Sequence, residues 1–204
     1  MPEFPTDPSD ETVMEPVAET TGRRTFVLVD GENIDATLGS SVLGRRPHPE
    51  ERPRWERVTA HLQAVWGQPV TGLFFLNASN GNLPTSFVQA LLAMDYRPVP
   101  LAGRSDEKVV DIGIQRTLTA LLDRPDTDVV LASHDADFAP QLADLLGTER
   151  RVGLLGFREF TSTHLVDLGL ELFDLEYDVR AFNAELPRVR IIALADFDPT
   201  YFLR

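Results

Sequence analysis

The chain has no cysteine, and this absence excludes disulfide bonds, thiolate metal sites and cysteine nucleophiles together. It also has no apolar run that approaches the roughly 18 to 20 residues needed for a membrane-spanning helix. Its N-terminal stretch lacks both the basic start and the apolar core of a secretory signal. These absences predict a soluble, cytoplasmic protein with no membrane partner.

Positive charge is also scarce, because 19 basic residues face 32 acidic ones and the formal net charge is −13. All but one of the basic residues are arginine, and the single lysine is Lys108. A broad basic surface of the kind that general nucleic-acid binders use is therefore excluded. Any contact with nucleic acid needs a local patch, a metal ion or a basic partner.

The length of 204 residues, of which 43% are hydrophobic, suits one domain with a real core plus tails. Residues 1–22 are acidic and rich in Pro and Thr without apolar periodicity, which predicts a disordered tail. Residues 23–180 form the predicted domain. Residues 181–204 are too apolar for an idle tail, and this extension either packs on the domain or binds a partner.

Apolar runs of strand length alternate with segments of helical period along the predicted domain. Strands are expected at 25–30, 70–76, 97–103, 128–133 and 151–157, with a sixth within 172–179. Helices are expected after Pro53, at 83–94, after a cap at Ser105 or Asp106, at 140–146 and at 162–170. The Gly- and Pro-rich stretch 35–54 predicts a long loop. This alternation implies a three-layer α/β/α fold with a mostly parallel sheet of five to six strands.

Carboxylates gather where the predicted strands end. The first strand runs into Asp30 and the sequence GEN, and the fourth runs into SHDAD at residues 133–137. In the common strand order these two strands are neighbours, so Asp30 and Asp135 would face each other across one crevice. Asp111 borders the apolar stripe of its helix, shares a face with Lys108, and belongs to a helix that starts at the same edge.

Several carboxylates within a few ångströms repel one another unless a cation neutralises them. Oxygen ligands of this kind suit Mg²⁺ or Mn²⁺, which would activate water for phosphodiester cleavage. Each acid also has a simpler interpretation: Asp30 as part of a turn, Asp111 as a solvated helix acid, and Asp135 with Asp137 as a helix cap. Their coincidence at one edge favours a metal site. Arg104 and Arg158 lie on loops expected at that edge and are candidate phosphate contacts.

Three segments together resemble the signature of the NYN domain family, which belongs to the PIN-like nuclease superfamily. They are VDGEN at 29–33, KVVD at 108–111 and SHDADF at 133–138, and the resemblance extends from residue 25 to about 178. It implies a PIN-like sheet and a ribonuclease dependent on Mg²⁺ or Mn²⁺. The metal-binding, catalytic acids carried over by position are Asp30, Asp111, Asp135 and Asp137.

The resemblance also assigns polar roles. Asn33 would be the polar catalytic residue, Lys108 would lie near the substrate phosphate, and Ser133 would contact phosphate or metal-bound water. The chain departs from the family pattern at His134, where a glycine is common, and this side chain is expected to be structural or to lie beside substrate. The stretch 35–54 would form a lid or a binding surface.

The resulting hypothesis is a metal-dependent endoribonuclease whose partner is an RNA substrate. The alternative is a catalytically weak or inactive PIN-like scaffold that acts through protein partners, bound by the acidic tail or the C-terminal segment. A phosphatase with an aspartate nucleophile would need Asp-x-Asp after the first strand, and position 32 is Glu. The glycine pattern of a dinucleotide-binding domain and the P-loop are missing as well.

Overall fold

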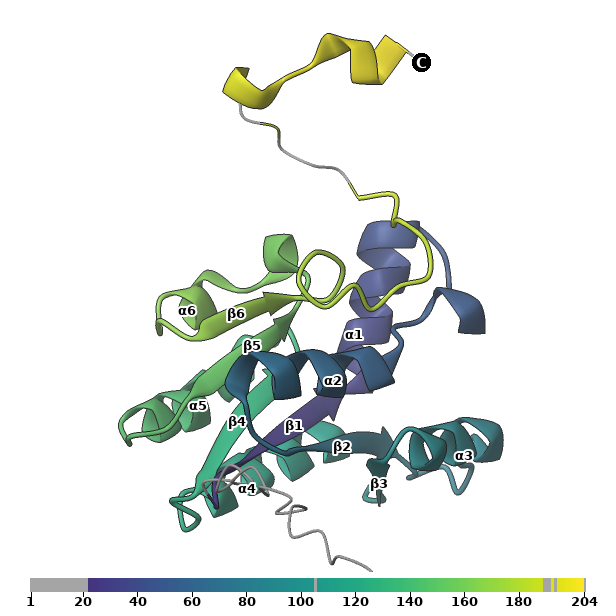
Figure 1. Ribbon diagram of the computed structural model, residues 1–204. Coiled ribbons are helices and arrows are strands. Elements are labelled where there is room, and N and C mark those ends of the chain that lie inside the picture. The colour runs from purple at the N-terminus through teal and green to yellow at the C-terminus, as the bar shows by residue number, and fades with distance from the viewer. Residues whose placement is uncertain (1–21, 105, 189–191, 193, 204) are drawn as a thin grey trace, which may run out of the picture.

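The computed structural model describes residues 22–104, 106–188, 192 and 194–203. The expected disordered tail therefore lies, apart from Gly22, outside the described residues. Six parallel strands form one sheet in the order β3-β2-β1-β4-β5-β6 (Figure 1). The strands are β1 Arg24–Asp30, β2 Val70–Asn77, β3 Tyr96–Leu101, β4 Thr127–Ala132, β5 Val152–Gly156 and β6 Glu171–Asp174. The predicted parallel α/β fold is confirmed.

Helices cover both faces of this sheet. The helices are α1 Gly31–Thr37, α2 Trp55–Trp66, α3 Thr85–Ala93, α4 Val109–Leu121, α5 Ala139–Leu146 and α6 Thr163–Val166. Side chains alternate along β1, so that Val27 and Val29 join the core beneath α2 while Leu28 joins the core beneath α4 and α5. In the central strand β4 every residue is buried. No helix in the described part of the chain is both long enough and apolar enough to cross a membrane.

The strand order of this sheet indicates where a ligand would bind. β1 pairs with β2 on one side and with β4 on the other, so the chain reverses its direction of travel across the sheet at β1. In an open parallel sheet the crevice at such a switch lies beyond the carboxyl ends of the strands. The residues that follow β1 and β4 therefore share one crevice, as the sequence predicts.

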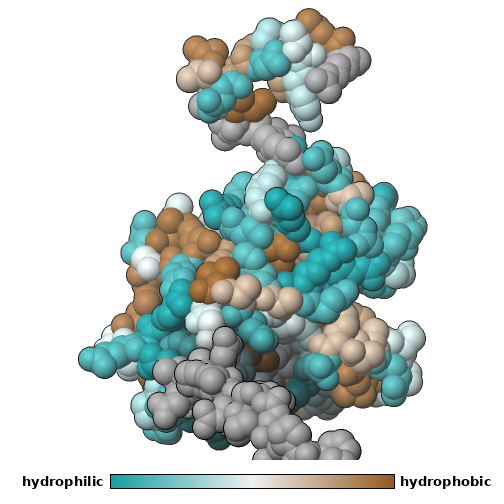
Figure 2. All heavy atoms as spheres, in the orientation of Figure 1, coloured by the Kyte–Doolittle hydropathy of each residue, from teal (hydrophilic) through white to brown (hydrophobic). Residues whose placement is uncertain are grey.

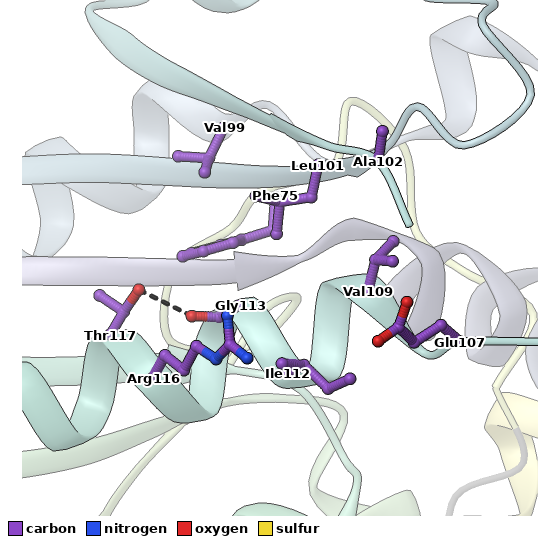
Figure 3. A pocket seen from close by; sticks show the side chains of 10 residues that line it. All are labelled: Phe75, Val99, Leu101, Ala102, Glu107, Val109, Ile112, Gly113, Arg116 and Thr117. Carbon is purple, nitrogen blue, oxygen red and sulfur yellow. Dashed lines mark hydrogen bonds between the residues drawn. The ribbon is translucent and has the colours of Figure 1, made fainter. Parts of the chain in front are cut away.

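The edge strand β3 contains Pro98 and Pro100, which an interior strand would not accommodate. Helix α4 lies close to this edge, and an open cavity of about 290 Å³ separates the two (Figure 3). Gly113 allows the close approach, because a Cβ at this position would lie 2.2 Å from Leu101 Cδ1. Arg116 and aliphatic side chains line the cavity.

The sequence predicts a loop at 35–54, and this prediction is wrong over the first half of the stretch. Helix α1 continues through a π-helical segment, Leu38–Leu43, and ends at Gly44, whose φ is +67°. Ile34, Leu38 and Val42 recur every four residues and are buried in the core beneath α2. This burial outweighs the tendency of Gly39 to interrupt a helix. Beyond Gly44 the chain is irregular up to α2, apart from a short 3-10 turn.

Helix starts also differ from expectation. Helix α4 begins at Val109 with Lys108 as its N-cap, not at Ser105 or Asp106, of which Ser105 lies outside the described residues. The cause is local: the Glu107 carboxylate accepts a hydrogen bond from the Arg104 backbone N–H at 3.0 Å and closes a separate turn before the helix. The expected helix at 162–170 shortens to α6, because Gly169 takes a φ of +75°.

Residues 181–188, which follow β6, pack against the domain. The Arg188 guanidinium, 3% exposed, pairs with Asp174, Glu159 and Glu176, and this cluster holds residues 181–188 against the sheet end. Two short 3-10 helices, Leu194–Asp196 and Pro199–Leu203, then stand clear of the domain in Figure 1. Figure 2 shows apolar side chains on this C-terminal segment.

Candidate active site

Asp30 is the best-fixed acid at the sheet edge. It ends β1 and caps α1, and its side chain is nearly inaccessible, with 3% exposure. The backbone N–H of Asn33 donates to one carboxylate oxygen at 3.2 Å, and the Ser133 hydroxyl donates to the other at 3.0 Å. The ends of β1 and β4 are thus linked through this carboxylate.

Burial raises the pKa of Asp30 from 3.8 to about 6. Desolvation is the largest cause. The hydrogen bonds from Asn33 and Ser133 lower the pKa, and the negative charges of Asp111 and Glu32 raise it again. A carboxylate that is costly to ionise and faces other acids gains stability from a bound cation.

The other acids surround the single lysine. The Lys108 ammonium lies 3.2 Å from an Asp111 carboxylate oxygen and 3.6 Å from one of Asp137. The hydrogen bond with Asp111, together with the charges of Asp111, Asp135 and Asp137, raises the pKa of Lys108. A cation therefore already lies among these carboxylates, on an exposed and mobile type of side chain.

Asp135 caps the turn that follows β4. Its carboxylate accepts the Asp137 backbone N–H at 2.9 Å, so the helix-cap interpretation holds for this residue as well. The Asp137 side chain is mostly exposed, at 64%. Gln115 on α4 donates to the Asp137 carbonyl at 3.3 Å, which joins this turn to the helix that carries Asp111.

Asn33 is oriented by the residue that replaces the family's glycine. Its side-chain oxygen accepts the His134 backbone N–H at 2.9 Å and lies 3.0 Å from His134 Nδ1. The Phe157 backbone N–H donates to His134 Nε2 at 2.8 Å, so the neutral ring carries its proton on Nδ1, within reach of Asn33 Oδ1 and, at 3.2 Å, of Thr37 Oγ1. The Asn33 oxygen is thus occupied, which leaves its amide N–H groups as donors for another partner.

The His134 ring is built into the domain. It is 8% exposed, and burial lowers its pKa to about 4, so it is neutral at physiological pH. A Cβ at Gly156 would lie 2.6 Å from Nε2, so the ring fits only because a glycine faces it. The sequence predicts a structural or substrate-adjacent residue. His134 supports Asn33 through a contact between residues that are 101 positions apart in the sequence, and no local sequence pattern reveals such a contact.

The two arginines expected at the phosphate lie in other pairs. Arg104 Nε is 3.4 Å from Asp106, and both side chains are largely exposed. Arg158 pairs with Asp178 at 2.7 Å. Among the described residues neither guanidinium contacts the acids of the site, so their phosphate roles remain predictions.

The arrangement of the acids suits a metal ion that keeps several water ligands better than an ion bound by protein ligands alone. Within the described ranges, no three side chains of Asp, Glu or His already converge with metal-binding geometry. Mg²⁺ typically keeps several waters and takes only one or two carboxylates directly, so a preformed cage is not required. The oxygen donor set, the raised pKa of Asp30 and the ammonium among the acids all fit such an ion.

Comparisons with known proteins bear on the family and the fold of this chain. The family model for the NYN domain matches residues 24–176, which include all six strands. A comparison with curated proteins gives no match. Among solved structures, a protein of unknown function from Vibrio parahaemolyticus RIMD 2210633 is similar in fold, with a TM-score of 0.61 and 21% sequence identity over 79% of this chain and 97% of that one. The chain therefore belongs to the NYN domain family of the PIN-like nuclease superfamily.

Proposed function

We propose that this protein is a divalent-metal-dependent endoribonuclease whose site lies beyond the carboxyl ends of β1 and β4. An NYN domain indicates a nuclease that acts on RNA. The observation that carries the proposal is Asp30: a carboxylate with 3% exposure and a pKa of about 6 that faces Asp111. Carboxyl groups with strongly shifted pKa values cluster at functional sites.

Asp30, Asp111 and Asp135, with Asp137 at the rim, would hold the Mg²⁺ or Mn²⁺. When bound, such an ion supplies a water nucleophile near neutral pH and stabilises charge on the phosphate. Asp30 is held in place for this role by Asn33 and Ser133.

The polar residues of the site act on the substrate. Asn33 presents its amide N–H groups, because His134 occupies its oxygen. The Lys108 ammonium is in reach of the acids and would neutralise the phosphate that arrives there. Ser133 bridges Asp30 and the Asp135 backbone N–H, and so keeps the two strand ends in register.

The direct test is cleavage of single-stranded and structured RNAs with Mn²⁺, Mg²⁺ or EDTA. Asp135→Asn removes one charge from the site, and Asp144→Asn on the exposed surface of α5 is a matched control. We expect metal-dependent products from the wild type and the control and none from Asp135→Asn. Full metal-dependent activity in Asp135→Asn would refute the site.

A second candidate function is that of a scaffold that acts through protein partners. It is favoured by the C-terminal segment, where the Leu194 and Leu203 side chains are 88% and 82% exposed. Copurification of a partner that is lost when residues 192–204 are deleted, together with no RNA turnover, would favour this function over the nuclease.

A further inference from the structure

A second cavity adjoins the residues that follow Asp30. Its volume is about 490 Å³, within the range of small-ligand pockets, which is about 300 to 1,000 Å³. Gly31 and Glu32, the two residues after Asp30, form one wall. The carboxyl end of β2 forms another, and its Phe75 is the register partner of Asp30. We call this cavity the aromatic pocket.

Four aromatic residues from three elements line the aromatic pocket. Trp55 comes from α2, Phe74 and Phe75 from β2, and Phe87 from α3. The ring centroids of Trp55 and Phe74 are 5.4 Å apart, those of Phe74 and Phe87 are 5.2 Å apart, and both pairs are edge-to-face. Phe87 is half-buried, so part of its ring faces the cavity. Trp55 and Phe74 are almost fully buried, so Phe87 is the ring that offers a stacking surface, and such stacking on a nucleobase tolerates any sequence.

The aromatic pocket contains charges of both signs, because the carboxylates of Glu32 and Asp35 line it together with two arginines. Arg46 and Arg52 line it. Arg52 Nε donates to Asp35 at 2.8 Å, whereas Arg46 has no salt bridge to any carboxylate that the structure describes. Burial raises the pKa of Asp35, and the charges of Arg52 and Arg46 lower it. The pocket thus offers a guanidinium that is available to a phosphate.

The cavity between β3 and α4 lacks this combination. It is smaller, at about 290 Å³, and Figure 3 shows Phe75 as its single ring among aliphatic residues, with Arg116 and Glu107 of opposite charge. One ring and one arginine give a nucleotide few contacts. The aromatic pocket differs because it has more rings, an arginine without a salt bridge among the described residues, and a wall formed by the residues that follow Asp30.

We propose that the aromatic pocket binds a single-stranded nucleotide next to the scissile phosphate, with its base against Phe87 and its phosphate on Arg46. This inference rests on the proposed function and names its substrate class. A paired base in a duplex enters such a pocket only after it is unstacked and flipped out, so we expect the pocket to bind single-stranded RNA in preference to a duplex. Arg46 and Arg52 belong to the stretch 35–54, which the sequence predicts to be a lid or a binding surface, and they supply the guanidinium groups that line the pocket.

Tryptophan fluorescence reports on the pocket directly. The chain has two tryptophans, and Trp66→Phe leaves Trp55, which lines the pocket, as the single emitter. In a Trp66→Phe/Asp135→Asn protein with EDTA, RNA is bound without cleavage. We expect a single-stranded octanucleotide to quench this emission and the same sequence in a duplex to leave it unchanged.

Two variants locate the binding. Phe87→Ala is expected to weaken binding of the octanucleotide by about 5- to 150-fold, which corresponds to the loss of a base-stacking ring. Arg46→Ala tests the pocket without removing a packed side chain, and is expected to weaken binding and reduce its salt dependence. The matched controls, expected to bind as the parent does, are Phe202→Ala in the C-terminal segment and Arg124→Ala before β4.

Failure of the pocket and failure of the nuclease give different results. Unchanged binding in both Phe87→Ala and Arg46→Ala, or equal quenching by the duplex, overturns the pocket even if the wild type cleaves RNA. Quenching by a peptide of residues 192–204 in preference to RNA also overturns it, and makes the cavity a protein-docking site. Quenching by single-stranded RNA that both variants weaken supports the pocket, even if the wild type shows no cleavage.

Discussion

Replacing Asp30 by asparagine removes one buried charge while keeping the shape of the side chain. The asparagine oxygen can still accept the Asn33 backbone N–H, and its amide group can donate to the Ser133 hydroxyl in place of the bond that the hydroxyl now donates. The main change is therefore the desolvation cost of the carboxylate. This cost can be worked out from the pKa of Asp30.

The pKa of Asp30 is about 6 in the folded protein against an ordinary value of 3.8. Since each pH unit of difference corresponds to about 1.36 kcal/mol, ionised Asp30 costs the folded state about 3 kcal/mol at most. The folded protein holds the proton that the unfolded chain loses between about pH 4 and pH 6. The contribution of Asp30 to the stability is therefore fully present below about pH 4 and is lost as the pH rises through 6. Asp30→Asn lacks this loss.

We expect metal-free Asp30→Asn to be more stable than the wild type by about 1 to 3 kcal/mol at pH 7.5, and nearly equal to it at pH 4. Urea unfolding in EDTA at both pH values measures the difference, and Asp144→Asn provides an exposed-carboxylate control. The variant should have no RNA cleavage despite its higher stability. A variant that is less stable than the wild type at pH 7.5 would refute the reasoning, because the hydrogen bonds would then outweigh desolvation.

Three further predictions follow from other contacts. Mn²⁺ should raise the Tm of the wild type and not that of Asp30→Asn; an equal rise in both proteins would place the ion elsewhere. His134→Gly should lower kcat about fivefold with little change in KM, the value of one hydrogen bond to Asn33, and His134→Gln should recover part of it; unchanged steady-state kinetics would contradict its positioning role. Arg188→Met should lower the free energy of urea unfolding by about 3 to 5 kcal/mol, because Asp174 and its neighbours stay buried without a cation; a smaller loss would mean that the carboxylates reach water.

Local signals fail where burial outweighs them. Gly39 predicts a loop, yet the chain stays helical to residue 43, because Leu38 and Val42 are buried in the core, and the helical segment ends only at Gly44. Gly39 even has a packing reason, since a Cβ there would lie 3.1 Å from the Arg45 carbonyl. A sequence pattern cannot weigh a core that residues far along the chain complete.

The sequence by itself predicted the parallel sheet and the edge at which the acids gather, whereas the strand order around β1 was taken from the common arrangement of such sheets and is confirmed by the structure. The prediction follows because apolar runs alternate with helical periods, and parallel strands send their carboxyl ends to the same side. Only the tertiary structure decided the chemistry of that edge. The pKa of Asp30 depends on burial by the whole domain, Asn33 is oriented by a ring 101 residues away, and the aromatic pocket joins Trp55, Phe74 and Phe87 from separate elements. Desolvation and contact over long sequence distances exist only once the chain has folded.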